Sequence, residues 1–211
     1  MPLFDLPTLL AYLAAATVLV LIPGPGTAWI VAQTIAGGTR RGVRAGFGLE
    51  TATLIHALAA GFGLSALLAA SALAFEILKY AGAAYLVWLG IKAWRDKVER
   101  VPTPATDVPT RGRVYWRSVV TGVLNPKVAL FFLAFLPQFV HPERGLVWLQ
   151  FLVLGVLLSL IGFSNSCVLA LAVGRFGRSL SGNARVARWR QRLIGTVFVG
   201  LGLKLALQQR S

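Results

Sequence analysis

Long apolar stretches are the feature that most constrains this chain. A helix that crosses a bilayer needs about 20 mainly apolar residues, because the hydrocarbon core is about 30 Å thick and a helix rises about 1.5 Å per residue. Six stretches of the 211-residue chain approach or exceed that length, at residues 9–36, 45–71, 75–94, 118–140, 145–174 and 193–209. The sequence therefore predicts an all-α polytopic membrane protein with six transmembrane helices.

The composition excludes several other classes of protein. Apolar residues make up 56% and charged residues 13% of the chain, whereas soluble domains average about 45–50% and about 25%. A disordered chain and an ordinary soluble enzyme are excluded, and the single cysteine, Cys167, allows no internal disulfide. The spans leave no room for a soluble domain, so we expect one transmembrane domain over residues 1–211, with a proline-containing linker at about 96–116.

Basic residues are distributed unevenly among the connections between the spans. Sixteen of the 21 Lys and Arg residues lie in the first, third and fifth connections, and four lie in the other connections and the tails. Because positive charge stays on the cytoplasmic side, loops 1, 3 and 5 are predicted to be cytoplasmic and both termini to lie outside. The net charge of +14 then reflects topology and contact with anionic lipids rather than binding of nucleic acid.

Proline interrupts the first and fourth spans near their middles. Residues 22–26 read Ile-Pro-Gly-Pro-Gly, and residues 124–127 read Leu-Asn-Pro-Lys. Proline lacks an N–H and clashes with the preceding turn, so each helix should kink or break there. The third and sixth spans also match, since both are short and carry a lysine near the outer end.

These matches predict a 3+3 inverted repeat with a proline-broken first helix in each half. Repeat one covers residues 8–95 and repeat two residues 117–209, and an odd number of helices reverses the second copy in the membrane. Inverted repeats with broken helices in matching positions are typical of secondary transporters with a site near the midplane. The alternative is that the prolines make two ordinary kinks.

Glu50 and His56 are ionisable residues inside the second span. A charged group at a helix centre costs at least about 2.5–3.5 kcal/mol, so it marks a site by default. Glu50 is predicted to bind a substrate ammonium or to carry a proton, and the alternative is that it snorkels or pairs with Arg41 or Arg44. His56 is a candidate proton relay, although a lone histidine on an apolar helix is more often packed against a carbonyl.

The two breaks supply the other candidate binding residues. A restarted half-helix presents free N–H groups and a positive dipole end, which suit a carboxylate. The candidates at the breaks are Pro23, Gly24, Pro25, Gly26, Thr27, Asn125, Pro126 and Lys127. Lys127 would neutralise a substrate carboxylate or pair with Glu50, unless it snorkels to the interface. We further expect Trp29 to line a pocket. Ser164, Asn165 and Ser166 are expected to join helices, and the alternative is that they line the path.

Three segments carry motifs that are specific in combination. Residues 22–48 read IPGPGTAWIVAQTIAGGTRRGVRAGFG, residues 79–95 read KYAGAAYLVWLGIKAWR, and residues 122–140 read GVLNPKVALFFLAFLPQFV. In this order and spacing they resemble the LysE/RhtB amino-acid exporter family over nearly the whole chain. The resemblance implies export of amino acids or related small solutes across the bacterial inner membrane, driven by the proton gradient or by antiport. The resemblance does not decide whether the chain forms a homodimer.

Other functional classes lack the residues that they need. An intramembrane protease needs a Ser/His pair, two aspartates or a zinc motif, but no Asp lies inside any predicted span, and His56 and Ser65 are about 13 Å apart along one helix. A metal exporter would have only Glu50, His56 and Cys167 as ligands. We therefore expect no enzyme activity and no cofactor. Export of a metal ion or another small metabolite, or a passive channel, remains the alternative.

Overall fold

The computed structural model describes residues 3–70 and 111–180, and seven single positions between residues 77 and 196. The predicted third and sixth spans, the linker up to residue 110 and the motif at 79–95 lie almost wholly outside the described residues. Within the described part the regular structure is helical and contains no strand, which confirms the prediction of an all-α chain. The α-helices are α1 (Leu6–Leu21), α2 (Pro25–Gly37), α3 (Thr39–Ala70), α5 (Arg111–Val123), α6 (Pro126–Leu130) and α7 (Val147–Leu180).

Within the described residues, three segments are long and apolar enough to cross a membrane, if each of two bent helix pairs counts as one span. The segment Val147–Phe176 of α7 qualifies alone. Helices α1 and α2 form a pair bent by 52°, and Gly112–Val123 with Pro126–Phe139 forms a pair bent by 46°. Both bends fall at the predicted proline breaks. Helix α5 begins at Arg111, inside the stretch assigned to the linker, because its amphipathic first turns bury Val114 and expose Arg113.

Short irregular helices connect α6 to α7. The segment η1 (Phe131–Phe135) is a π-helix, and η2 (Leu136–Phe139) and η3 (Pro142–Arg144) are 3₁₀-helices. The buried Gln150 side chain fixes the turn before α7, because its amide donates to the carbonyl oxygens of His141 at 2.9 Å and Gly145 at 2.8 Å. Gly145 has φ 72°, a left-handed conformation that favours glycine.

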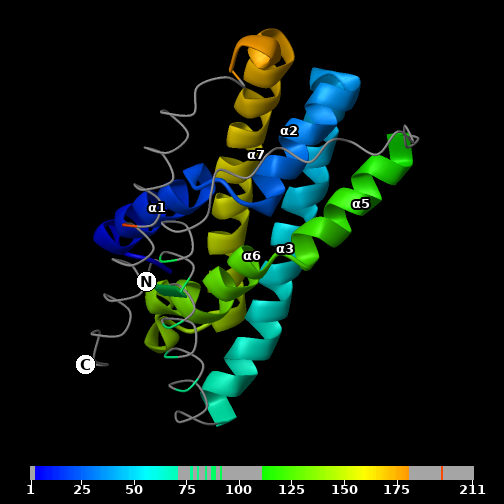
Figure 1. Ribbon diagram of the computed structural model, residues 1–211. Coiled ribbons are helices and arrows are strands. Elements are labelled where there is room, and N and C mark those ends of the chain that lie inside the picture. Colours follow the sequence, from blue (N-terminus) through cyan, green and yellow to red (C-terminus); the bar gives the residue numbers. More distant parts are fainter. Residues whose placement is uncertain are drawn as a thin grey trace.

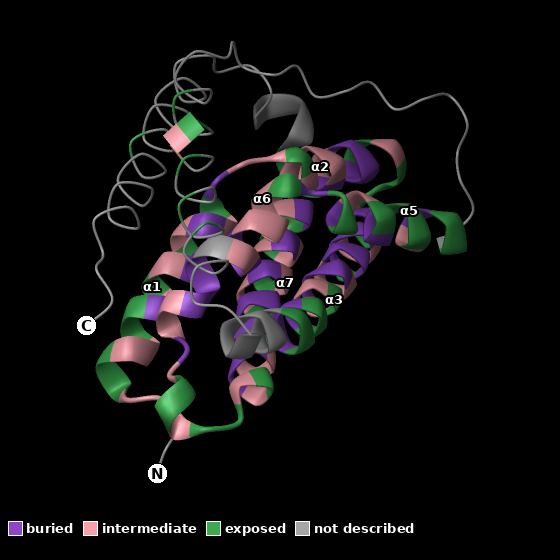
Figure 2. Ribbon diagram, turned by 90° about the horizontal axis from the view of Figure 1, so that it is seen from below, coloured by how far each residue is buried: buried purple, intermediate pink, exposed green. Residues whose placement is uncertain are grey.

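Helices α3 and α7 pack antiparallel (Figure 1), and small residues line their contact. We call these residues the stripe. A Cβ atom on Gly46 would overlap Ser166, and one on Gly155 would overlap Ala57. Buried residues are concentrated where the two helices face each other (Figure 2). Small residues let helix backbones approach closely, which favours van der Waals packing in a membrane. The stripe brings the Glu50 side chain of α3 against the middle of α7.

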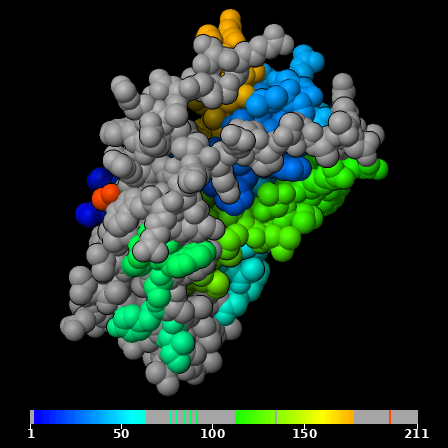
Figure 3. Space-filling view, in the orientation of Figure 1, coloured from blue at the N-terminus to red at the C-terminus, as the bar shows by residue number. Residues whose placement is uncertain are grey.

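Helix α5 lies against α2 and α3, and Figure 3 shows α2 in blue next to α5 in green. The indole Nε1 of Trp29 donates to the hydroxyl of Ser118 at 2.7 Å, which joins α2 to α5. Gly122 packs against Ala52, so the end of α5 lies directly on α3. These contacts bring the start of α6 near the start of α2.

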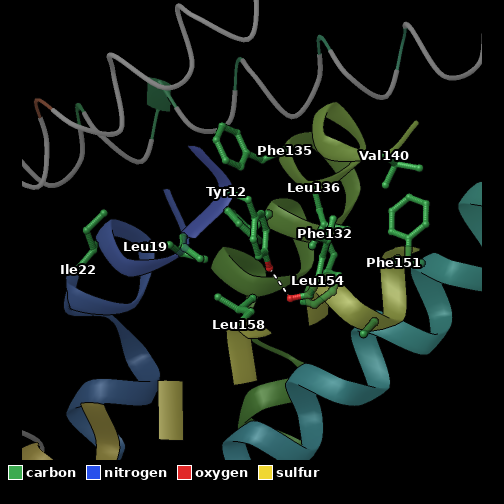
Figure 4. Close-up of a cluster of buried hydrophobic side chains, with 14 residues drawn as sticks. Tyr12, Leu19, Ile22, Phe132, Phe135, Leu136, Val140, Phe151, Leu154 and Leu158 are labelled. Carbon is green, nitrogen blue, oxygen red and sulfur yellow. Dashed lines mark hydrogen bonds between the residues drawn. The ribbon is translucent and has the colours of Figure 1, made fainter. Parts of the chain in front are cut away.

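An aromatic core fills the space between α1, η1, η2 and α7 (Figure 4). Tyr12 is completely buried, and its hydroxyl donates to the Leu154 carbonyl oxygen at 2.5 Å. Its ring meets Phe139 edge to face, with 5.3 Å between the ring centroids. Leu19 and Leu158 belong both to this core and to the lining of the cavity described next. The core therefore forms one wall of that cavity.

Candidate functional site

The first helix break separates α1 from α2 around Pro23 and Gly24. Pro25 occupies the first position of α2, where its missing N–H costs nothing and its fixed φ suits the helix. Gly24 is the N-cap residue with extended backbone, and no side chain of the described residues caps this end. The first turn of α2 therefore keeps backbone N–H groups for another partner.

The second helix break separates α5 from α6 at Leu124 and Asn125. Pro126 takes the first position of α6, as Pro25 does in α2. Here the side-chain oxygen of Asn125 accepts a hydrogen bond from the backbone N–H of Lys127 at 3.1 Å. The second break is therefore capped by its own side chain.

A cavity of about 80 Å³ lies between the two breaks. A cavity needs on the order of 10–15 Å³ to hold one water, so this one has space for several waters or a small solute. Its lining residues come from α1, α2, α3, α6 and α7, and from the end of α5. Its lining is Leu19, Val20, Gly26, Thr27, Ile30, Leu49, Glu50, Thr53, Gly122, Asn125, Lys127, Val128, Leu158, Gly162, Asn165 and Ser166.

Lys127 connects the two breaks. Its ammonium Nζ donates to the carbonyl oxygen of Ile22 at 2.9 Å and to that of Leu19 at 3.2 Å. These carbonyls lie at the C-terminal end of α1, where backbone oxygens lack helical partners and the helix dipole is negative. The Lys127 ammonium is therefore held at the end of α1.

Glu50 faces the cavity from α3. Thr53 and Ser159 lie beside its carboxylate, and Lys127 is near enough for electrostatic attraction. Among the described residues, close ion pairs join His141 to Glu143 and Arg144 to Asp5, and none joins Glu50 to Lys127. The cavity therefore holds one acidic and one basic side chain that are anchored separately.

The predicted site residues divide into three groups. Five of them line the cavity together: Gly26, Thr27, Glu50, Asn125 and Lys127. Four others shape the breaks without lining the cavity: Pro23, Gly24, Pro25 and Pro126. His56 does not line the cavity, and its Nε2 lies 3.4 Å from the Gly122 carbonyl oxygen while its ring stacks on Phe132.

Sequence reasoning missed the wall that α7 contributes. Ser159 and Gly162 were not candidates, yet Ser159 lies beside Glu50, and Gly162 contacts Glu50 and lines the cavity. Asn165 and Ser166 also line the cavity, which was the alternative to the expected role in joining helices. Their signal is the recurrence of small or polar residues every three or four positions, which marks one helix face. Trp29, expected to line a pocket, is not part of the lining.

Comparisons with known proteins place this chain in a family. The chain matches the family described as LysE type translocator over residues 17–209. A membrane protein of Vibrio cholerae, whose name states no function, is 38% identical over 205 residues, or 96% of this chain and 98% of that protein.

Two relatives are named for transport. A homoserine/homoserine lactone efflux protein of Salmonella typhimurium is 41% identical over 146 residues, or 69% of this chain and 70% of that protein. A leucine efflux protein of an Enterobacter species is 31% identical over 196 residues, or 92% of this chain and 93% of that protein. These relatives are transporters rather than enzymes, and no solved structure matches the chain. The chain therefore belongs to the LysE type translocator family of membrane transporters.

Proposed function

We propose that this chain exports small amino acids across the bacterial inner membrane by secondary transport, and that the cavity between the helix breaks binds the substrate. The observation that carries the proposal is that the Glu50 carboxylate and the uncapped start of α2 share one cavity lining. The ammonium of an amino acid suits the Glu50 carboxylate. Its neighbouring carboxyl group suits the free N–H groups at the start of α2.

The substrates in the relatives' names indicate which part of the molecule is recognised. Those names are homoserine, homoserine lactone and leucine. All three molecules have an amino group on the carbon next to a carbonyl, but the lactone has no carboxylate. The charge that they share is the ammonium, which favours Glu50 as the main anchor.

The carbonyl or carboxylate oxygen is assigned to the backbone N–H groups of Gly26 and Thr27. Such donors bind a neutral carbonyl as well as a carboxylate, since both are hydrogen-bond acceptors. Lys127 adds positive charge to the lining, but its ammonium already donates to two carbonyls of α1. Lys127 is therefore assigned a supporting role.

The arrangement of the breaks supports a 3+3 inverted repeat, with repeat one at about residues 8–95 and repeat two at about 117–209. The second half-helix starts with proline in both cases, at Pro25 and at Pro126. Transport would then consist of one repeat rocking against the other around the cavity. The charge distribution orients loops 1, 3 and 5 to the cytoplasm and both termini outward.

The proton gradient is the proposed energy source, with Glu50 as the proton carrier. Among the described residues that line the cavity, Glu50 is the acidic one. A proton and a substrate ammonium would therefore compete for the same carboxylate, which couples proton entry to substrate release. His56 is assigned to packing, because it does not line the cavity and its ring lies against the Gly122 carbonyl oxygen and Phe132.

The test is counterflow in proteoliposomes loaded with unlabelled amino acids, with a labelled one outside. The wild type should exchange a few amino acids. In Glu50→Gln the rate of exchange should fall about 10-fold or more, because one charge-assisted contact to the substrate is lost. The control is Glu143→Gln, which changes an exposed acid outside the cavity and should exchange normally.

Two other outcomes would redirect the proposal. Normal exchange by Glu50→Gln would contradict the assigned site. No exchange of any amino acid by the wild type would contradict the substrate class and leave a metal ion, another metabolite or a channel. Net efflux, but not exchange, should stop when an uncoupler collapses the proton gradient, and efflux that continues would contradict proton coupling.

A further inference from the structure

The two charged side chains of the cavity are anchored across the chain. Lys127, from the C-terminal half, is held by the carbonyls of Leu19 and Ile22 in the N-terminal half. Glu50, from the N-terminal half, contacts Ser159 and Gly162 of α7 in the C-terminal half. Each charged side chain thus contacts the half to which it does not belong.

Gly162 lies directly against the Glu50 carboxylate. A Cβ atom at Gly162 would overlap both carboxylate oxygens, so the observed position of Glu50 exists only because residue 162 has no side chain. Ser159, one turn earlier on the same face of α7, lies beside the same carboxylate. Together they form a seat for Glu50 on α7.

The seat matters because an opposite charge shares the cavity. Two opposite charges attract strongly where water is scarce, and they approach each other unless something holds them apart. A closed Glu50–Lys127 ion pair would satisfy both groups internally, and an ammonium arriving from the cytoplasm would have to break it. Retention of Glu50 by α7 keeps the carboxylate available.

We propose that Gly162, with Ser159, is the positioning residue that holds the Glu50 carboxylate on α7 and away from Lys127, so that it receives the substrate ammonium. This inference rests on the proposed function. Addition of a methyl group in Gly162→Ala displaces the carboxylate, and the cavity is the open space beside it. The displaced carboxylate then moves towards Lys127 and pairs with it.

The experiment measures half-saturating concentration and maximal rate of counterflow, with L-homoserine and L-leucine as probes. Gly162→Ala should raise the half-saturating concentration about 10-fold or more, the effect of one misplaced methyl group in a pocket. Ser159→Ala, which adds no bulk, should raise it about 3-fold, less than a full charge-assisted hydrogen bond is worth. Combining Gly162→Ala with Glu50→Asp, a carboxylate shorter by one methylene, should restore part of the loss.

Gly155→Ala is the matched control. It lies on the same stripe of α7, and its Cβ would overlap Ala57 rather than a charged group. It should lower the melting temperature or the amount of folded protein but leave the half-saturating concentration unchanged. Equal shifts of that concentration in Gly155→Ala and Gly162→Ala, or no recovery in the double variant, would overturn the proposal.

A second readout needs no substrate. Thermal melting of the purified protein gives a double-mutant cycle between Glu50→Gln and Lys127→Met, measured in the wild type and in Gly162→Ala. The coupling between the two side chains should increase in Gly162→Ala, because the carboxylate has moved towards the lysine. Unchanged coupling would overturn the positioning role, whether or not either amino acid is transported.

Discussion

The two helix breaks that border the cavity differ in how their second helices begin. At the first break, Gly24 precedes α2, and no side chain of the described residues caps the free N–H groups. At the second, the Asn125 side chain accepts a hydrogen bond from the backbone N–H of Lys127. An uncapped start offers donors to a ligand, whereas a capped start has already used one. Two breaks with the same proline signature therefore have different roles, one in binding and the other in support.

Lys127→Met should have the largest effect, because Lys127 joins the two breaks. It removes hydrogen bonds to the carbonyls of Leu19 and Ile22, and each hydrogen bond to a charged group is worth about 1.5–3 kcal/mol. The free energy of unfolding should fall by about 2 kcal/mol or more, and counterflow should fall to background. Lys127→Arg keeps the charge and should retain part of the stability and part of the counterflow. A Lys127→Met variant as stable as the wild type would show that the breaks are independent.

Gly26→Ala tests whether the first break is the binding one. The added Cβ would lie 3.4 Å from Leu49 and 3.8 Å from the Asn125 amide nitrogen, which are ordinary contacts, so the fold should be retained. The methyl group would project beside the donors of α2 and should raise the half-saturating concentration for counterflow about 10-fold. Gly24→Ala is the control, since Gly24 is outside the cavity lining and its Cβ would lie 3.6 Å from Lys127. Equal effects of the two changes would contradict binding at this end of α2.

Asn125→Ala tests whether the second break is the supporting one. Loss of an N-cap side chain costs about 1 kcal/mol, and the melting temperature should fall accordingly. Asn125→Ser retains a capping oxygen and should recover most of that stability. If Asn125→Ala and Asn125→Ser lose counterflow equally while both keep wild-type stability, Asn125 binds substrate directly and the contrast between the breaks is smaller than proposed.

Asp5→Asn should have the smallest effect, at a capped helix start far from either break. Hydrogen bonds from Thr8 and the ion pair with Arg144 hold the pKa of Asp5 below its ordinary value. A lowered pKa means that the charged form stabilises the folded state above pH of about 4, and that this stability is lost as the pH falls further. Asparagine still caps, so only the charge is removed. The melting temperature of Asp5→Asn at pH 7 should be slightly below that of the wild type, and this difference should shrink in acid. A difference that grows in acid would contradict the assignment.

Local chemistry made part of this site predictable. A proline kinks or breaks a helix when it falls inside one, so Pro23, Pro25 and Pro126 located both breaks without knowledge of the tertiary structure. The cost of an ionisable group in lipid likewise singled out Glu50 and Lys127, and both line the cavity. These predictions needed only the identity of a residue and its place in an apolar run.

The partners of those residues were not predictable, because they depend on how helices pair. The contact between Glu50 and Gly162 follows from the antiparallel packing of α3 on α7, which no local pattern specifies. Small residues such as Ser159 also serve equally well in packing and in lining a cavity. The attachment of Lys127 to α1 is similar, since it joins positions more than one hundred residues apart in the chain.

The most direct test of the central claim, that Glu50 holds the ammonium while α2 binds the carbonyl, is competition among three compounds in wild-type counterflow of L-homoserine. Homoserine lactone keeps the amino group and loses the carboxylate, whereas 4-hydroxybutyrate keeps the carboxylate and loses the amino group. If L-leucine is the exchanged amino acid, its methyl ester and 4-methylpentanoate make the same comparison. We predict that the lactone or ester competes within about 10-fold of the amino acid and that the deaminated acid does not compete. Competition by the deaminated acid without competition by the lactone or ester would contradict the account and make Lys127 the anchor.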